Sequence, residues 1–95
     1  MAEKSSITAT VEFAVYGALM GGDENKAAGL IVTGALQSQI NENNGIVKIN
    51  NTTMGAEPDP APKNTKHFGA IVNVNGTLYA YACEENQEID FFHHV

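Results

Sequence analysis

The sequence contains no arginine and no tryptophan, and its five cationic residues are all lysines. Eleven acidic residues outnumber them and leave a net charge of −6. A surface that binds the phosphates of nucleic acids or of anionic lipids needs a cluster of cationic side chains. We therefore expect neither a nucleic-acid partner nor a membrane partner.

Cysteine is nearly absent, since Cys83 is the single cysteine in the chain and an internal disulfide bond is excluded. No neighbouring residue in the sequence would activate its thiol, so we expect a small buried hydrophobe. Long apolar runs are missing as well. No segment approaches the roughly 18 residues of a membrane span, and the first residues lack the apolar core of a signal peptide. The expected location is the cytoplasm.

The chain has 95 residues, of which 43% are hydrophobic, and this composition is typical of an ordinary globular domain. We expect a single domain over 1–95, with a flexible N-terminus at 1–5 and an exposed tail at 93–95. A domain of this size buries only about 60–65% of the surface of its unfolded chain. Homo-oligomerisation would therefore stabilise it.

The first half of the chain contains one strand pattern and one helix pattern. Residues 7–19 alternate, with Ala9, Val11, Phe13 and Val15 on one side and Thr8, Thr10, Glu12 and Tyr16 on the other, which predicts a half-buried strand. The polar run after Gly21 and Gly22 predicts a loop. Val32, Leu36 and Ile40 recur every fourth residue and predict a helix over about 33–43, with Gln37 on its polar side. Thr33 is the expected N-cap, and Gly45 is expected to end the helix before a strand at 46–50.

The second half contains the clearest local signal, an Asn75-Gly76 pair between two alternating apolar runs. Such a pair predicts a hairpin with a type I′ turn. Its register would pair Val74 with Thr77, Val72 with Tyr79, Ala70 with Tyr81 and Phe68 with Cys83.

The opposite face of this hairpin is also apolar, with Ile71, Leu78 and Ala80. If Glu85 and Asn86 form another turn, Ile89 and Phe91 join that face. The sheet then needs cover on both sides. The predicted fold class is mainly β (α+β), a compact antiparallel sheet or sandwich-like domain in the order β, α, β, β, β, β.

No set of residues has the spacing of an active site or a metal site. His67, His93 and His94 have no cysteine or carboxylate at ligand spacing on the same element, and the acids at 23–24 lack the frame of a calcium loop. The serines and acids lie outside any nucleophile or acid–base motif. We expect no enzyme, no cofactor and no metal, although whether the three histidines meet in space stays open.

The segment 50–66 is the expected recognition loop, because it is polar, long, and stiffened by Pro58, Pro60 and Pro62 into an extended course. Candidate ligand-binding residues are Asn50, Asn51, Glu57, Asp59 and Lys66. Asparagine offers both a donor and an acceptor, as sugar hydroxyls require, and Tyr16, Tyr79 and Phe92 could offer stacking faces. The alternative interpretation is a spacer between two strands.

Several segments resemble a small domain of unknown function, found alone in bacteria and fungi and at the C-terminus of a mitochondrial DnaJ-like protein. The matching segments are VYGA (15–18), VTGALQSQI (32–40), NG (44–45), NNTTMG (50–55), the proline-rich stretch, Lys66, and FGAIVNVNGTLYAYA (68–82). The family pattern resembles D-V-T-x-x-L-Q, then G-D-P-x-P-G and a lysine. Here Ile31 replaces the acid, and the proline loop is longer. The resemblance implies a non-catalytic appendage or a free-standing binding or assembly unit.

These observations favour a non-catalytic binding or assembly module that recognises a protein or a glycan through polar loops. Two alternatives stay open: a homo-oligomeric structural subunit without a small-molecule ligand, and a small hydrolase.

Overall fold

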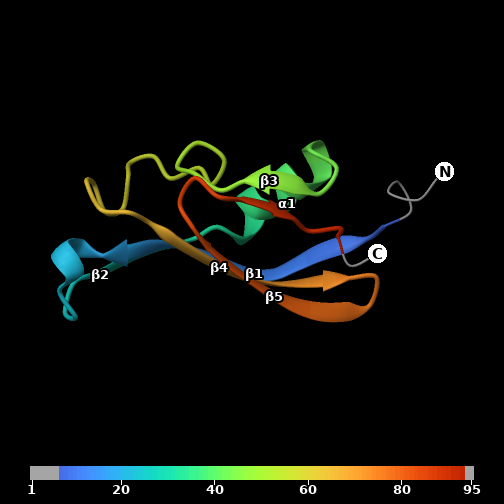
Figure 1. Cartoon of the computed structure of the whole chain (residues 1–95), viewed down its shortest axis with the longest axis horizontal. Coiled ribbons are helices and arrows are strands. Elements are labelled where there is room, and N and C mark those ends of the chain that lie inside the picture. The colour runs from blue at the N-terminus through green and yellow to red at the C-terminus, as the bar shows by residue number, and fades with distance from the viewer. Residues whose placement is uncertain (1–6, 94–95) are drawn as a thin grey trace.

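The computed structural model describes residues 7–93, which form two layers (Figure 1). The larger layer is an antiparallel sheet of four strands in the order β2-β1-β4-β5. The bounds of these strands are Ala9–Leu19 for β1, Ala27–Ile31 for β2, His67–Val74 for β4 and Thr77–Glu84 for β5. A short 3₁₀ turn, Met20–Gly22, joins β1 to β2.

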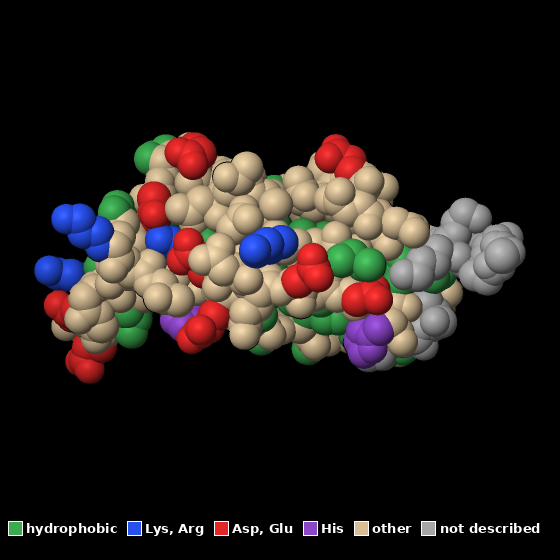
Figure 2. Space-filling model, turned by 45° about the horizontal axis from the view of Figure 1, so that its top comes forward, with side chains coloured by type: hydrophobic (Ala, Val, Ile, Leu, Met, Phe, Trp, Pro, Cys, Tyr) green, Lys and Arg blue, Asp and Glu red, His purple; other side chains and the backbone are tan. Residues whose placement is uncertain are grey.

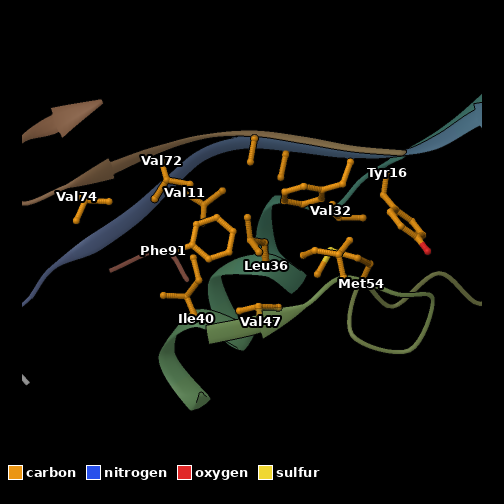
Figure 3. Packing of buried hydrophobic residues seen from close by; sticks show 14 of the residues in the cluster. Val11, Tyr16, Val32, Leu36, Ile40, Val47, Met54, Val72, Val74 and Phe91 are labelled. Carbon is orange, nitrogen blue, oxygen red and sulfur yellow. The ribbon is translucent and has the colours of Figure 1, made fainter. Parts of the chain in front are cut away.

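The smaller layer consists of α1 (Thr33–Glu42) and a two-stranded sheet of β3 (Ile46–Lys48) and β6 (Glu88–Asp90). It lies over one face of the large sheet, which we call the inner face (Figure 1). The core lies between the layers, where Leu36, Ile40, Val47 and Phe91 of the smaller layer meet Val11 and Val72 of the large sheet (Figure 3). The predicted class, a mainly β antiparallel domain with one helix, is confirmed.

The Asn75-Gly76 hairpin forms in the predicted register. Val74 pairs with Thr77, and the pairing continues without a shift to Phe68 and Cys83. Asn75 and Gly76 both have positive φ, 51° and 93°, as a type I′ turn requires. Local turn chemistry therefore sets the alignment of β4 and β5.

The face assignment in β1 is wrong beyond Val11, because a bulge interrupts the pairing with β4 between Val11 and Phe13. A bulge inserts one extra residue and reverses the alternation that follows it. Ala14 and Tyr16 consequently turn inward and are fully buried, whereas Phe13 and Val15 turn outward.

The prediction of a loop before the helix is wrong in part, because the strand β2 forms there. β2 contains Gly29 and two alanines, which have weak strand propensity. Pairing with β1 therefore stabilises β2 in place of intrinsic strand propensity. The two backbones approach closely where Gly17 lies opposite Gly29. A Cβ at Gly17 would collide with the carbonyl oxygen of Ala28.

The last strand does not extend the large sheet. β6 pairs with β3 instead, with Val47 opposite Ile89. Phe91 is therefore buried on the inner side, where its ring lies 4.6 Å from that of Tyr81. The expectation that Ile89 and Phe91 join the opposite face is wrong, because the turn at Glu85 and Asn86 leads the chain across to the second layer.

The helix has the predicted location, but two of its polar side chains have unexpected partners. The N-cap position is Val32, and Thr33 Oγ1 accepts from the backbone N–H of Ala14 at 3.1 Å. Gln37 is half-buried: its Oε1 accepts from Val11 N at 2.8 Å, and its Nε2 donates to Ala9 O at 2.9 Å. Thr33 and Gln37 thus bind the part of β1 that β2 does not reach.

The prediction that Gly45 ends the helix is wrong by one residue, because α1 ends at Glu42 and Asn44, with a φ of 54°, is the first left-handed residue after its C-cap; Gly45 follows it. It has a φ of 88°, and its N–H donates to Ile40 O at 3.0 Å. The predicted flexible N-terminus at 1–5 lies outside the described residues, as do 94–95 of the predicted tail. His93 is exposed, whereas Phe91 and Phe92 before it are buried.

Candidate functional site

Three of the five candidate residues meet beside the end of β1. Lys66, which is 3% exposed, donates through Nζ to Asp59 Oδ2 at 2.8 Å and to the carbonyl of Ala61 at 3.2 Å. Asn51 Nδ2 donates to the same Asp59 oxygen at 3.0 Å. The sequence grouped Asn51, Asp59 and Lys66, and the fold brings them into contact.

Two further residues complete this cluster, and neither was among the five candidate ligand-binding residues. The hydroxyl of Tyr16 donates to Asn51 Oδ1 at 2.6 Å. Glu85 Oε1 lies 3.7 Å from Lys66 Nζ and accepts from the Lys66 backbone N–H at 2.9 Å. We call these five residues, Tyr16, Asn51, Asp59, Lys66 and Glu85, the loop network. The sequence placed Tyr16 on the polar side of its strand, as a possible stacking face, whereas the bulge turns it inward.

The other two candidates lie apart from the loop network. Asn50 closes a local turn, in which its Oδ1 accepts from Thr53 N at 2.8 Å. Glu57 is exposed. The loop does not keep the predicted extended course throughout, because residues 61–64 form a turn in which Asn64 N donates to Ala61 O at 3.1 Å.

Charges and burial in the loop network stabilise one protonation state. The hydrogen bond from Lys66 holds the pKa of Asp59 below its usual value, and the bonds from Ala61 N and Asn51 act in the same direction. Burial raises the pKa of Tyr16 to about 12, and the negative charges of Glu85 and Asp59 add to this effect. Near neutral pH, Asp59 is therefore a carboxylate and Tyr16 a neutral phenol.

This arrangement suits an anchor better than a binding pocket. Every buried polar side-chain atom within residues 7–93 has a hydrogen-bond partner. Met54, Ala56 and Ala61 of the same loop are at most 1% exposed and fix it to the core. The loop network thus holds 50–66 against β1, and its polar atoms bind each other.

The other candidate groups are not brought together. Cys83 is half-buried, and burial raises the pKa of its thiol, which disfavours the reactive thiolate. Of the predicted stacking faces, Tyr16 and Phe92 are buried and Tyr79 is half-buried. Within the described part of the chain, no three His, Cys, Asp or Glu side chains lie close enough together to hold a metal ion. No helix in that part could span a bilayer.

A second surface stands out on the large sheet, on the face away from α1. Eight large hydrophobic residues of the described chain are conspicuously exposed, and six of them lie on this face: Phe13, Val15, Leu19, Ile31, Ile71 and Leu78. We call it the outer face; no described segment covers it (Figure 1). The sequence predicted the apolar character of Ile71, Leu78 and Ala80, but it missed Phe13, Val15 and Ile31 because a bulge and an unrecognised strand place them there.

The outer face has shallow hollows between its large side chains. Strand pairing places Ile31, Val15, Gly69 and Ala82 in one row, and Gly29, Gly17, His67 and Glu84 in the next. The small residues of these rows leave a hollow of about 480 Å³ beside Leu19. A second hollow, of about 340 Å³, lies between Phe13, Ile71 and Ala80.

The structure defines the chain by its architecture. It is an antiparallel, mainly β domain with one helix. No protein-family model, no curated protein and no solved structure matches it. The resemblance to the small domain of unknown function stays a prediction.

Proposed function

We propose that this protein is a non-catalytic binding module that contacts a protein partner through the outer face. The supporting observation is the concentration of exposed large hydrophobics on one side, including Ile31 at 71%, Leu78 at 61% and Phe13 at 50% exposure. Exposed apolar side chains gathered on one surface typically mark a contact with another macromolecule. The opposite side is different: acidic side chains are scattered over the surface seen in Figure 2.

Three titratable groups support the non-catalytic part of this proposal. General acids and bases work best with a pKa near the operating pH. Here the pKa of Asp59 is lowered, while those of Tyr16 and Cys83 are raised, so each moves away from neutrality. The sequence-based prediction of a recognition site at 50–66 has less support, because Asn51, Asp59 and Lys66 bind each other.

Photo-crosslinking in the producing cells tests this proposal. A photoreactive phenylalanine analogue replaces Phe13, and the control position is Ile46, which is 42% exposed on β3 in the other layer. We expect a discrete crosslinked product from position 13, identified by mass spectrometry, and none from position 46. Uncrosslinked protein alone from position 13, or the same products from both positions, would overturn the proposal.

A further inference from the structure

The centre of the outer face carries no charge, although the protein as a whole has a net charge of −6. The central row of Ile31, Val15, Gly69 and Ala82 and the neighbouring row of Phe13, Ile71 and Ala80 contain no ionisable side chain. Ionisable side chains lie around these rows: His67 and Glu84 lie opposite each other at one border, and the exposed Glu12 lies next to Phe13 in the bulge. Two acidic chains repel each other, so the surface through which they can pack closely is one free of charge.

The outer face carries both exposed side chains and hollows. Phe13, which is half exposed, borders the smaller hollow, while Gly17, Gly29 and Gly69 line the larger one. When two copies are related by a two-fold axis, the same patch lies on both sides of the contact, so a side chain such as Phe13 can enter a hollow of the other copy. Stacked sheets pack in this way, about 10 Å apart, with interleaved side chains.

The size of the outer face fits a small dimer interface. Strands spaced about 4.8 Å apart, with eight residues of about 3.3 Å each, give a four-stranded sheet a face of about 500 Å². Standard interfaces bury about 800 Å² of accessible surface per partner, and weaker, reversible ones bury less. A second copy would also supply the layer that a sheet with two apolar faces needs.

We propose that the outer face binds the outer face of a second copy, forming a two-fold symmetric sandwich of two four-stranded sheets. This inference rests on the proposed function, in that it takes the outer face as the contact surface and names its partner. The smaller layer, formed by α1, β3 and β6, then faces solvent on both sides of the dimer.

Sedimentation of the full purified chain over a range of concentrations tests the inference. The monomer mass is 10.1 kDa, and we expect the mass to approach twice this value as concentration rises. Ile71→Lys places a charge at the centre of the outer face and should leave a monomer at every concentration. Ile46→Lys is a matched control, since Ile46 and Ile71 are 42% and 41% exposed on opposite layers; it should dimerise like the wild type.

Circular dichroism of both variants checks that the fold is intact, and Ile71→Thr, which keeps a β-branched side chain, replaces Ile71→Lys if that variant fails to fold. Isotope-filtered NMR on a mixture of labelled and unlabelled chains should show contacts between copies from Phe13 and Ile71, and none from Ile46.

The results separate the two proposals. A wild-type chain that stays monomeric at its highest soluble concentration, or a dimer that Ile71→Lys does not weaken, overturns the second copy as partner. If position 13 still crosslinks to a different protein in cells, the proposed function stands without the dimer. If neither dimer nor crosslink forms, both proposals fail.

Discussion

Asp59 joins three donors of the 50–66 loop. Its carboxylate accepts hydrogen bonds from Lys66, Asn51 and the backbone of Ala61. These donors stabilise the ionised carboxylate more than the protonated acid, so the pKa of Asp59 is lowered from its ordinary value of 3.8.

This shift predicts a specific dependence of stability on pH. Because the pKa in the folded state lies below that in the unfolded state, the contribution of Asp59 is present above its ordinary pKa and is lost as pH falls through the folded-state value. Asp59→Asn should therefore lower the urea midpoint at neutral pH, and its difference from the wild type should shrink in acid. Glu57→Gln, a change to an exposed acid of the same loop, should leave the neutral-pH midpoint unchanged. A difference that stays constant with pH would contradict the role given to Asp59.

Gly76 is a second residue whose backbone decides local structure, because its φ is 93°. Gly76→Ala should destabilise the fold by about 1 kcal/mol or more, since alanine resists a positive φ. Gly34 provides a control of opposite sign: it lies in α1, and a Cβ there meets nothing within 4 Å. Gly34→Ala should stabilise by about 0.5–1 kcal/mol because alanine favours helix. Urea denaturation of both variants measures the effects, and a neutral Gly76→Ala would refute the turn assignment.

At the scale of elements, α1 does more than cover the core. β2 pairs with β1 only from Val15 to Leu19, and the rest of that edge of β1 has no strand beside it. Gln37 binds the backbone of Val11 and Ala9 there, and Thr33 binds that of Ala14. Helix side chains thus bind partly buried backbone groups of β1 that have no strand partner on this edge.

We expect Gln37→Ala to cost about 1–3 kcal/mol, because it leaves a backbone donor and a backbone acceptor of β1 unpaired. Gln39→Ala is the matched control on the same helix, where Gln39 bonds only the exposed Asn43 side chain. The control should change stability by less than about 0.5 kcal/mol. Chemical denaturation of both variants measures this, and equal losses would remove Gln37 from its role at the edge of β1.

The elements also separate what local patterns can and cannot predict. Residues near in sequence determine the hairpin and the helix, and both were predicted. Asn75-Gly76 determines the hairpin, and the recurrence of Val32, Leu36 and Ile40 at every fourth position determines the helix. β2 depends on pairing with β1 and has almost no local signal. The partner of β6 could not be predicted, because a turn leaves the direction of the next strand open.

At the scale of the whole molecule, the proposed dimer joins two acidic chains through an uncharged surface. Added salt should then strengthen association, because it screens the repulsion between net charges of −6. We expect the dissociation constant to fall several-fold as NaCl rises from about 0.01 M to about 1 M, over which the screening length falls from about 30 Å to about 3 Å. Sedimentation measures this constant. Association that weakens with salt would indicate interfacial ion pairs and contradict an uncharged contact.

The sequence by itself determined the class of fold, the helix, the hairpin register and the polar, acidic character of the chain, because composition, periodicity and turn chemistry act locally. Only the tertiary structure decided which faces are buried. One extra residue at the bulge of β1 turns Tyr16 into the loop network and Phe13 onto the outer face, and β6 crosses to the second layer instead of extending the large sheet. These outcomes depend on pairing between distant segments. The mutual polar contacts of the 50–66 loop and the exposed apolar surface of the outer face therefore both result from tertiary packing.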